Sequence, residues 1–328
     1  MSDTKRIMSS FILKILLLVF TVITLILCIL YSPIGILTAT YDSEPQSFII
    51  KKGDSLQKIA VNLTQKNLIA HPISAYIATI ALGKRGKLQA GEFVFKGKNT
   101  PIDIINTLSS NAYAYRFITV TEGMSVKQIV QLLKDTKYLE GEIMTIPKEG
   151  LILPETYAYT FGENRQIVLN RMILEMEKLL KQVDIEIFNN PYITSHQDLL
   201  TLASLVEKET GVAGERAEIA GVYLNRLKVN MPLQCDPTVI YGITQGEKLQ
   251  RQLTRIDLQQ HTPYNTYTNK GLPPGPIACP GKNSILAVLS PARTQNLFFV
   301  ANGTGGHSFS KDLKGHNQNV AAWRKIQK

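Results

Sequence analysis

The sequence is poor in cysteine, with three residues in 328, and this scarcity excludes a small scaffold held together by disulfides. Collagen-like, coiled-coil and other short repeats are also lacking. Apolar residues make up 44% of the chain and charged residues 19%, a globular composition that excludes wholesale disorder. A chain of this length is expected to form about two domains.

Arginine-rich runs are missing, although the net charge is +10. The charge indicates an anionic partner, but lysines and arginines are scattered, so we expect no nucleic-acid partner. The sequence also lacks a G-x-S-x-G nucleophile elbow and a phosphate-binding loop. His307 and His316 do not have zinc-ligand spacing, so no metal and no organic cofactor is indicated.

Only one long apolar run occurs, over residues 11–31, and its single charge is Lys14 near the start. About 20 apolar residues span a bilayer as a helix, so the run predicts a single-pass membrane anchor. Lys5 and Arg6 precede the run and predict a cytoplasmic tail over residues 1–10. A cleaved signal peptide is the alternative, but its apolar region would be shorter.

The cysteines leave one question open. Cys28 lies in the apolar run, whereas Cys235 and Cys279 lie in the part expected outside the cell membrane, where disulfides can form. A bridge between the last two and a pair of buried free thiols are both compatible with the sequence.

Residues 48–63 predict a strand, a turn and an amphipathic helix that Ser55 can cap. Residues 118–133 repeat this pattern at an offset of 70, with Ser125 at the cap position. One explanation is a pair of related strand–turn–helix units within residues 46–145. The alternative is that the two segments share only the residue pattern common to any strand that leads through a turn into a helix.

Longer helices are expected over residues 164–183, 195–210 and 214–229, followed by an irregular stretch at 232–281. Helices and short strands are segregated rather than strictly alternating. This order predicts a mixed α+β catalytic domain over residues 146–328.

Residues 199–211 place two carboxylates beside a buried helix face. On a helical wheel, Glu207 and Glu209 fall on opposite edges of the apolar face. Desolvation there can raise a carboxyl pKa and produce a general acid. The alternative is that both are ordinary charges at the rim, paired with Arg216 or Arg226.

Residues 225–242 set polar groups in an apolar loop broken by prolines. Asn225 closes a helix, and Gln234 and Asp236 lie among apolar side chains, as a sugar site requires. Turn chemistry explains Asp236 equally well, because Asp-Pro commonly opens turns.

Residues 262–281 are too rich in glycine and proline for a helix or a central strand. A long loop inside a compact domain is often functional, and Tyr264, Asn265 and Tyr267 are its candidate binding residues. A rigid structural wrap is the alternative.

Taken in order, four segments resemble the endolytic murein transglycosylase family: LASLVEKET, YLNRLKVNMPLQCDPTVIYG, YNTYTNKGLPPGPIACPG and GGHSFSKDLKGHN. The earlier segment GDSLQKIA resembles the opening of a LysM domain, a module that binds N-acetylglucosamine-containing glycans. The family resemblance extends from about residue 48 to the end of the chain.

The resemblance implies a bacterial inner-membrane enzyme with its catalytic domain in the periplasm. It implies cleavage inside nascent peptidoglycan glycan strands, termination of their growth, and peptidoglycan synthases as neighbours. By similarity the catalytic acid is Glu209, with Glu207 in reserve. The residues expected to bind substrate are Glu207, Asn225, Gln234, Asp236, Tyr264, Asn265 and Tyr267.

The implied reaction breaks the β-1,4 bond between N-acetylmuramic acid and N-acetylglucosamine without water and leaves a 1,6-anhydro end. A lysozyme-like hydrolase is one alternative, with Asp236 or Glu207 as its second carboxylate. The other alternative is a non-catalytic anchor that binds peptidoglycan through the LysM-like unit.

Overall fold

The computed structural model describes residues 3–30, 32–183 and 191–326. The chain divides into two compact units, Met1–Arg116 and Phe117–Lys328. The division precedes the second strand–turn–helix pattern, so the two patterns lie in different units. Within the described residues the fold is mixed α+β, as expected.

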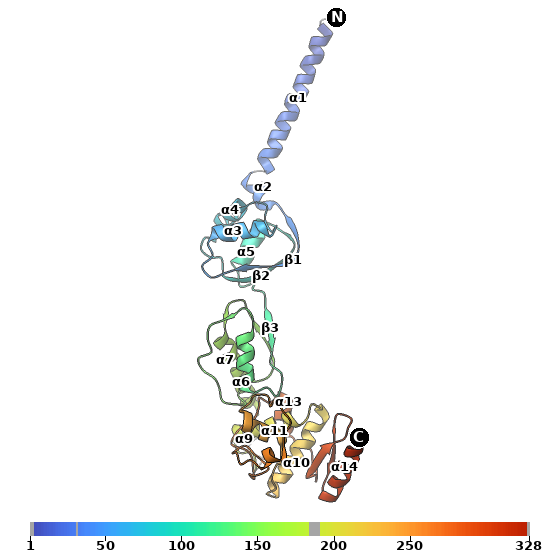
Figure 1. Cartoon of the computed structure of the whole chain (residues 1–328). Coiled ribbons are helices and arrows are strands. Elements are labelled where there is room, and N and C mark those ends of the chain that lie inside the picture. The colour runs from blue at the N-terminus through green and yellow to red at the C-terminus, as the bar shows by residue number, and fades with distance from the viewer. Residues whose placement is uncertain (1–2, 31, 184–190, 327–328) are drawn as a thin grey trace. The chain divides into compact units, whose positions relative to one another are not determined.

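The chain begins with helix α1 (Asp3–Leu30) (Figure 1). Within the described residues, no helix has both the length and the apolar character that crossing a membrane requires. This finding contradicts the expected membrane helix at 11–31 and the expected single-pass inner-membrane location with a periplasmic catalytic domain. Residue 31 and the side chains of the expected tail lie outside the described residues.

The first unit is built on one antiparallel strand pair, in which Phe48 lies opposite Phe93. Both phenylalanines are buried and belong to a separate core of this unit. Ser55 accepts a hydrogen bond from the Lys58 amide and caps the following helix, which confirms the expected strand, turn and helix. The elements of this unit after α1 are α2 (Pro33–Thr38), β1 (Tyr41–Ile50), α3 (Leu56–Gln65), α4 (Pro72–Ala81), β2 (Gly91–Asn99) and α5 (Pro101–Leu108).

The second strand–turn–helix pattern is also confirmed, with β3 running into the second unit. Ser125 caps α6, and a capping box with Gln128 completes the turn. Buried side chains of α6 and α7 share one hydrophobic core. This part contains β3 (Arg116–Thr119), α6 (Val126–Asp135), β4 (Leu139–Glu140), β5 (Thr156–Tyr159), β6 (Glu163–Asn164) and α7 (Arg165–Gln182).

The remaining part of the second unit packs around α9, whose side chains from Leu199 to Val206 are all buried. Two helices, α11 and α12, interrupt the stretch expected to be irregular. Pro237 does not prevent α11, since it lies in the first turn, where proline is tolerated. The elements are α9 (His196–Glu209), η1 (Ala213–Glu215), α10 (Arg216–Lys228), α11 (Asp236–Thr244), α12 (Arg255–Gln259), α13 (Lys282–Leu289), β7 (Phe298–Ala301), β8 (His307–Ser310) and α14 (Leu313–Ile326).

Candidate active site

Glu209 is the last residue of α9 and is half-buried. Its Oε1 accepts a hydrogen bond of 2.8 Å from the hydroxyl of Tyr223. Burial raises the pKa of the Glu209 carboxyl, and the nearby charge of Asp236 adds to this effect. Hydrogen bonds from Cys235 and Tyr223 act in the opposite direction. Among the described residues, none of the ion pairs involves Glu209.

The two hydrogen-bond donors to Glu209 come from α10 and from the residue before α11. Tyr223 lies on α10, is fully buried, and meets the ring of Phe299 edge-on at 5.9 Å between centroids. Cys235 immediately precedes α11 and is a buried free thiol. Burial raises the pKa of both groups, so both stay protonated and can donate to a carboxylate at Glu209.

Asp236 and Tyr267 complete this cluster from two other segments. The Tyr267 hydroxyl donates a hydrogen bond of 2.6 Å to Asp236 Oδ1, and burial raises the pKa of Tyr267. The Asp236 side chain is exposed at the start of α11. The structure thus brings Glu209, Asp236 and Tyr267 together, three of the residues expected at the site.

Glu207 lies on the same helix but has a different environment. Its side chain is only 5% exposed. Its Oε2 accepts hydrogen bonds from the Gly281 amide at 2.9 Å and the Ser284 hydroxyl at 2.7 Å. Its Oε1 lies 3.7 Å from Arg216 Nη2. Because Gly281 and Ser284 belong to the first turn of α13, Glu207 caps that helix.

The two asparagines expected to bind substrate donate hydrogen bonds from their side-chain amides to backbone carbonyl oxygens. Asn225 Nδ2 donates to the carbonyl oxygens of Thr294 and Asn296, at 2.9 and 3.1 Å. Asn265 is fully buried and donates to two carbonyl oxygens at the end of α12, at 3.0 and 2.7 Å. Both side chains therefore tie loops to the helical core.

Gln234 is exposed and has a φ of +48°, in the left-handed region. Its backbone amide donates to the Thr266 carbonyl at 3.1 Å. The unusual backbone conformation turns the chain directly before Cys235 and Asp236. Gln234 thus lies next in sequence to two groups of the Glu209 cluster.

Tyr264 does not belong to the Glu209 cluster and instead lines a cavity of about 580 Å³. Its ring packs against Tyr241, with centroids 4.8 Å apart. Glu149 lines the same cavity, and its Oε1 accepts a hydrogen bond of 2.8 Å from the Val126 amide. Burial raises the pKa of Glu149. Tyr264 is therefore an aromatic wall beside a buried carboxyl.

A hairpin of β7 and β8 is fixed next to the end of α9 through Glu215. Glu215 Oε2 lies 2.7 Å from His307 Nδ1 and accepts a hydrogen bond of 3.1 Å from the Thr210 hydroxyl. Burial raises the pKa of Glu215, but the hydrogen bonds from His307 and Thr210 outweigh burial, so the pKa is lowered overall.

In the described part of the chain, no group of three or more His, Cys, Asp or Glu side chains could hold a metal ion.

Local sequence patterns gave no sign of the contacts that Tyr223, Cys235, Glu149 and Glu215 make. Tyr223 resembles any other buried residue of a helix, and its partner is 14 residues away on another helix. The Cys235 thiol hydrogen-bonds to Glu209, and the Cys279 thiol lies 3.7 Å from Glu149 Oε1. The two cysteines are therefore free thiols with separate partners and do not form a disulfide with each other.

The chain is similar over most of its length to known proteins of one family. A family model described as the YceG-like family matches residues 48–322. An endolytic murein transglycosylase of Bacillus subtilis is 34% identical over 302 residues, covering 82% of each chain. One of Streptococcus pneumoniae is 34% identical over 83% of this chain, which spans only 57% of that longer protein. The crystal structure of a YceG-like protein from Listeria monocytogenes has a TM-score of 0.55 and 26% identity, and covers 84% of this chain and 98% of its own.

Proposed function

This chain belongs to the YceG-like family, and we propose that it is an endolytic murein transglycosylase, a lyase that cuts peptidoglycan glycan strands internally. The observation that carries the proposal is the environment of the Glu209 carboxyl. Burial raises the pKa of this carboxyl, and its hydrogen-bond donors are neutral rather than cationic. Such a group can give up a proton and later take one back.

In the first step, protonated Glu209 donates its proton to the oxygen that links C1 of N-acetylmuramic acid to C4 of N-acetylglucosamine. The C1–O bond breaks, N-acetylglucosamine leaves with a free 4-hydroxyl, and positive charge develops at C1. The Tyr223 hydroxyl donates to Oε1 and stabilises the carboxylate that remains.

In the second step, the 6-hydroxyl oxygen of the same muramic acid attacks C1. Its proton passes to the Glu209 carboxylate, which returns to its starting state. The product is a 1,6-anhydro ring, and no water is consumed. One carboxyl therefore serves as acid and then as base, and a raised pKa suits both roles near neutral pH.

The other site residues fall into two groups. Gln234, Asp236, Tyr264 and Tyr267 are assigned to substrate binding, because they lie in the Glu209 cluster, next to it in sequence, or on a cavity. Glu207, Asn225 and Asn265 are assigned to holding the loops in place, because backbone groups or Ser284 occupy their polar atoms.

A lysozyme-like hydrolase is the second candidate, and one observation favours it. The charge of Asp236 acts on Glu209, as the second carboxylate of a hydrolase would. Asp236 already accepts a hydrogen bond from Tyr267, however, which suits a binding role for this carboxylate. The reaction products distinguish the two mechanisms.

Three finer expectations remain proposals. The first unit, which contains the LysM-like segment, is assigned to binding N-acetylglucosamine-containing glycan. Nascent strands are the proposed substrate, and cleavage there would end strand growth. Peptidoglycan synthases are the proposed partners. Binding of the chain to purified sacculi, and its co-purification with a synthase, would test the first and last of these.

Mass spectrometry of the products made from uncrosslinked glycan strands tests the reaction. The lyase reaction yields muramic acid ends that are lighter than ordinary reducing ends by one water, and the Glu209→Gln variant yields none. Ordinary reducing ends would instead establish a hydrolase. Binding of strands without any cleavage would favour a non-catalytic binding protein.

A further inference from the structure

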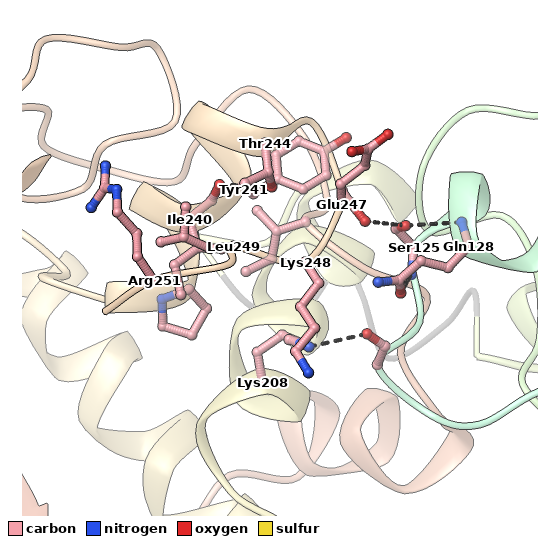
Figure 2. Close-up of a pocket in the computed structure, with 14 residues that line it drawn as sticks. Ser125, Gln128, Lys208, Ile240, Tyr241, Thr244, Glu247, Lys248, Leu249 and Arg251 are labelled. Carbon is pink, nitrogen blue, oxygen red and sulfur yellow. Dashed lines mark hydrogen bonds between the residues drawn. The ribbon is translucent and has the colours of Figure 1, made fainter. Parts of the chain in front are cut away.

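A cavity of about 500 Å³ lies in the second unit, between the turn before α6 and the segment that follows α11 (Figure 2). The mechanism described above uses none of its side chains. Its walls include Ser125, Lys208, Ile240, Lys248, Leu249 and Ile277. Its size is in the range of pockets that hold small ligands or short peptide segments.

The walls of this cavity are fixed by hydrogen bonds. The Ser125 hydroxyl, besides capping α6, donates a buried hydrogen bond of 2.6 Å to the Gly246 carbonyl. The Gly123 amide donates to the Cys279 carbonyl at 3.0 Å, and the Cys279 amide donates to the Met124 carbonyl at 2.8 Å. The cavity is therefore already formed without a ligand.

The lining of the cavity carries three cationic side chains and one carboxylate, Glu247, which is paired with Lys127. Lys208 Nζ donates to the Gly123 carbonyl at 3.2 Å, and Lys248 is exposed. In the described ranges of the chain, neither lysine forms an ion pair with a carboxylate. Arg251, in contrast, is neutralised by Asp257, with Nη2 2.8 Å from Oδ1. Figure 2 shows the Lys248 side chain extending toward Lys208.

The rest of the lining is largely aliphatic. Pro237, Ile240, Leu249 and Ile277 supply apolar surface next to the two ammonium groups. A bare inorganic anion would leave this surface uncovered, whereas a short peptide with carboxylates and methyl side chains would cover it. The lining therefore favours an acidic peptide over a simple anion.

Two residues that line the cavity are sequence neighbours of the Glu209 cluster. Lys208 directly precedes Glu209 in α9, and Pro237 directly follows Asp236 in α11. Murein carries such peptides on its muramic acid, the sugar that the proposed reaction attacks. An extended peptide spans about 3.3–3.6 Å per residue, so a peptide on a sugar bound at Glu209 can extend toward neighbouring segments.

We propose that this cavity binds the stem peptide of the substrate strand, with Lys208 and Lys248 receiving its carboxylates. The inference rests on the proposed function, because it assigns the peptide of the same substrate. The site would give the enzyme a preference for strands that still carry their peptides. The attraction is electrostatic, so added salt weakens this preference.

The test compares two substrates with the full chain. Uncrosslinked strands with stem peptides and the same strands stripped by an amidase are each assayed for kcat/KM. Wild-type protein is expected to prefer the peptide-bearing strands, and Lys248→Met is expected to reduce that preference about tenfold. Lys248→Arg retains most of it. Lys228→Met, at an exposed lysine outside the cavity lining, is the matched control and retains all of it.

Equal kcat/KM for the two substrates in the wild type, or an unchanged preference in Lys248→Met, would overturn the proposal. If the wild type cleaves neither substrate, the proposed function fails, and a binding measurement then decides about the cavity. The probe is a fluorescently labelled stem peptide released from murein. Weaker binding to Lys248→Met than to Lys228→Met supports the peptide site, and equal binding contradicts it.

Discussion

Glu207 and Glu209 are two residues apart at the end of α9, but the regions around them differ. Around Glu207, the first turn of α13 donates two hydrogen bonds and Arg216 lies 3.7 Å away. Around Glu209, the donors are a tyrosine hydroxyl and a thiol, and burial raises the carboxyl pKa. The first region surrounds its carboxyl with backbone, hydroxyl and guanidinium groups, and the second surrounds its carboxyl with neutral donors.

The difference shows that burial alone does not make a catalytic acid. The Glu207 side chain is only 5% exposed, yet its Oε2 accepts hydrogen bonds from the start of α13 and its Oε1 faces Arg216. Glu209 accepts hydrogen bonds from Tyr223 and Cys235 and lies near Asp236 at the start of α11. A general acid needs desolvation without such compensation.

Replacing each of the two glutamates by glutamine tests most directly whether Glu207 and Glu209 have different roles. Glu209→Gln cannot donate a proton, so we expect turnover of glycan strands to fall by about 10³-fold or more. Circular dichroism should show an unchanged fold. Glu209→Asp, which keeps the acid on a shorter side chain, is the matched control and should retain measurable turnover. Wild-type turnover in Glu209→Gln would remove Glu209 from the mechanism.

Glu207→Gln should have the opposite profile. It removes the negative charge that faces Arg216 and weakens the cap on α13, so we expect a loss of about 2–3 kcal/mol in the free energy of unfolding. Urea titration measures this loss. Turnover per folded molecule should fall far less than in Glu209→Gln. A stable Glu207→Gln protein without activity would show that Glu207 takes part in the chemistry.

Tyr223→Phe sharpens the account of Glu209. Removing the hydroxyl takes away a hydrogen bond that favours the carboxylate, so the pKa of Glu209 should rise further. The alkaline limb of the pH–rate profile should move to higher pH, and turnover at neutral pH should fall about tenfold. An alkaline limb that moves to lower pH would contradict the assigned direction of this hydrogen bond.

The smallest expected effect is on stability as a function of pH. Burial raises the pKa of Glu209 in the folded protein above its ordinary value of 4.5, so the folded state keeps a proton that the unfolded chain has lost. The stability of the wild type therefore declines as pH rises from the unfolded pKa through the folded one. Glu209→Gln does not titrate, so its stability relative to the wild type should increase from pH 4 to pH 8. Parallel stability curves in urea would show that the pKa is not raised.

Local patterns predicted much of the architecture. The apolar spacing of residues 199–206 gave α9, and serine at position 55 or 125 marked the start of a helix. These features depend on neighbours within a few residues. The apolar run at 11–31 predicts a membrane helix from the same kind of local evidence, and the finding that no described helix is long and apolar enough to cross a membrane contradicts this prediction.

The site was only partly predictable, because its chemistry depends on contacts between distant elements. A helical wheel places Glu207 and Glu209 symmetrically at the edges of one apolar face. Their difference comes from Gly281, which is 74 residues from Glu207, and from Tyr223 on α10. In the same way, Asn265 resembles a binding residue in sequence, but its amide hydrogen-bonds to α12.

The central claim is that Glu209 is held in the folded protein as a carboxyl of raised pKa. The most direct measurement is an infrared pH titration of the carboxyl band, taken as the difference between wild type and Glu209→Gln. The account predicts a single carboxyl that titrates above the ordinary glutamate value of 4.5 and matches the alkaline limb of the pH–rate profile. A Glu209 band that titrates at or below that value would contradict the account.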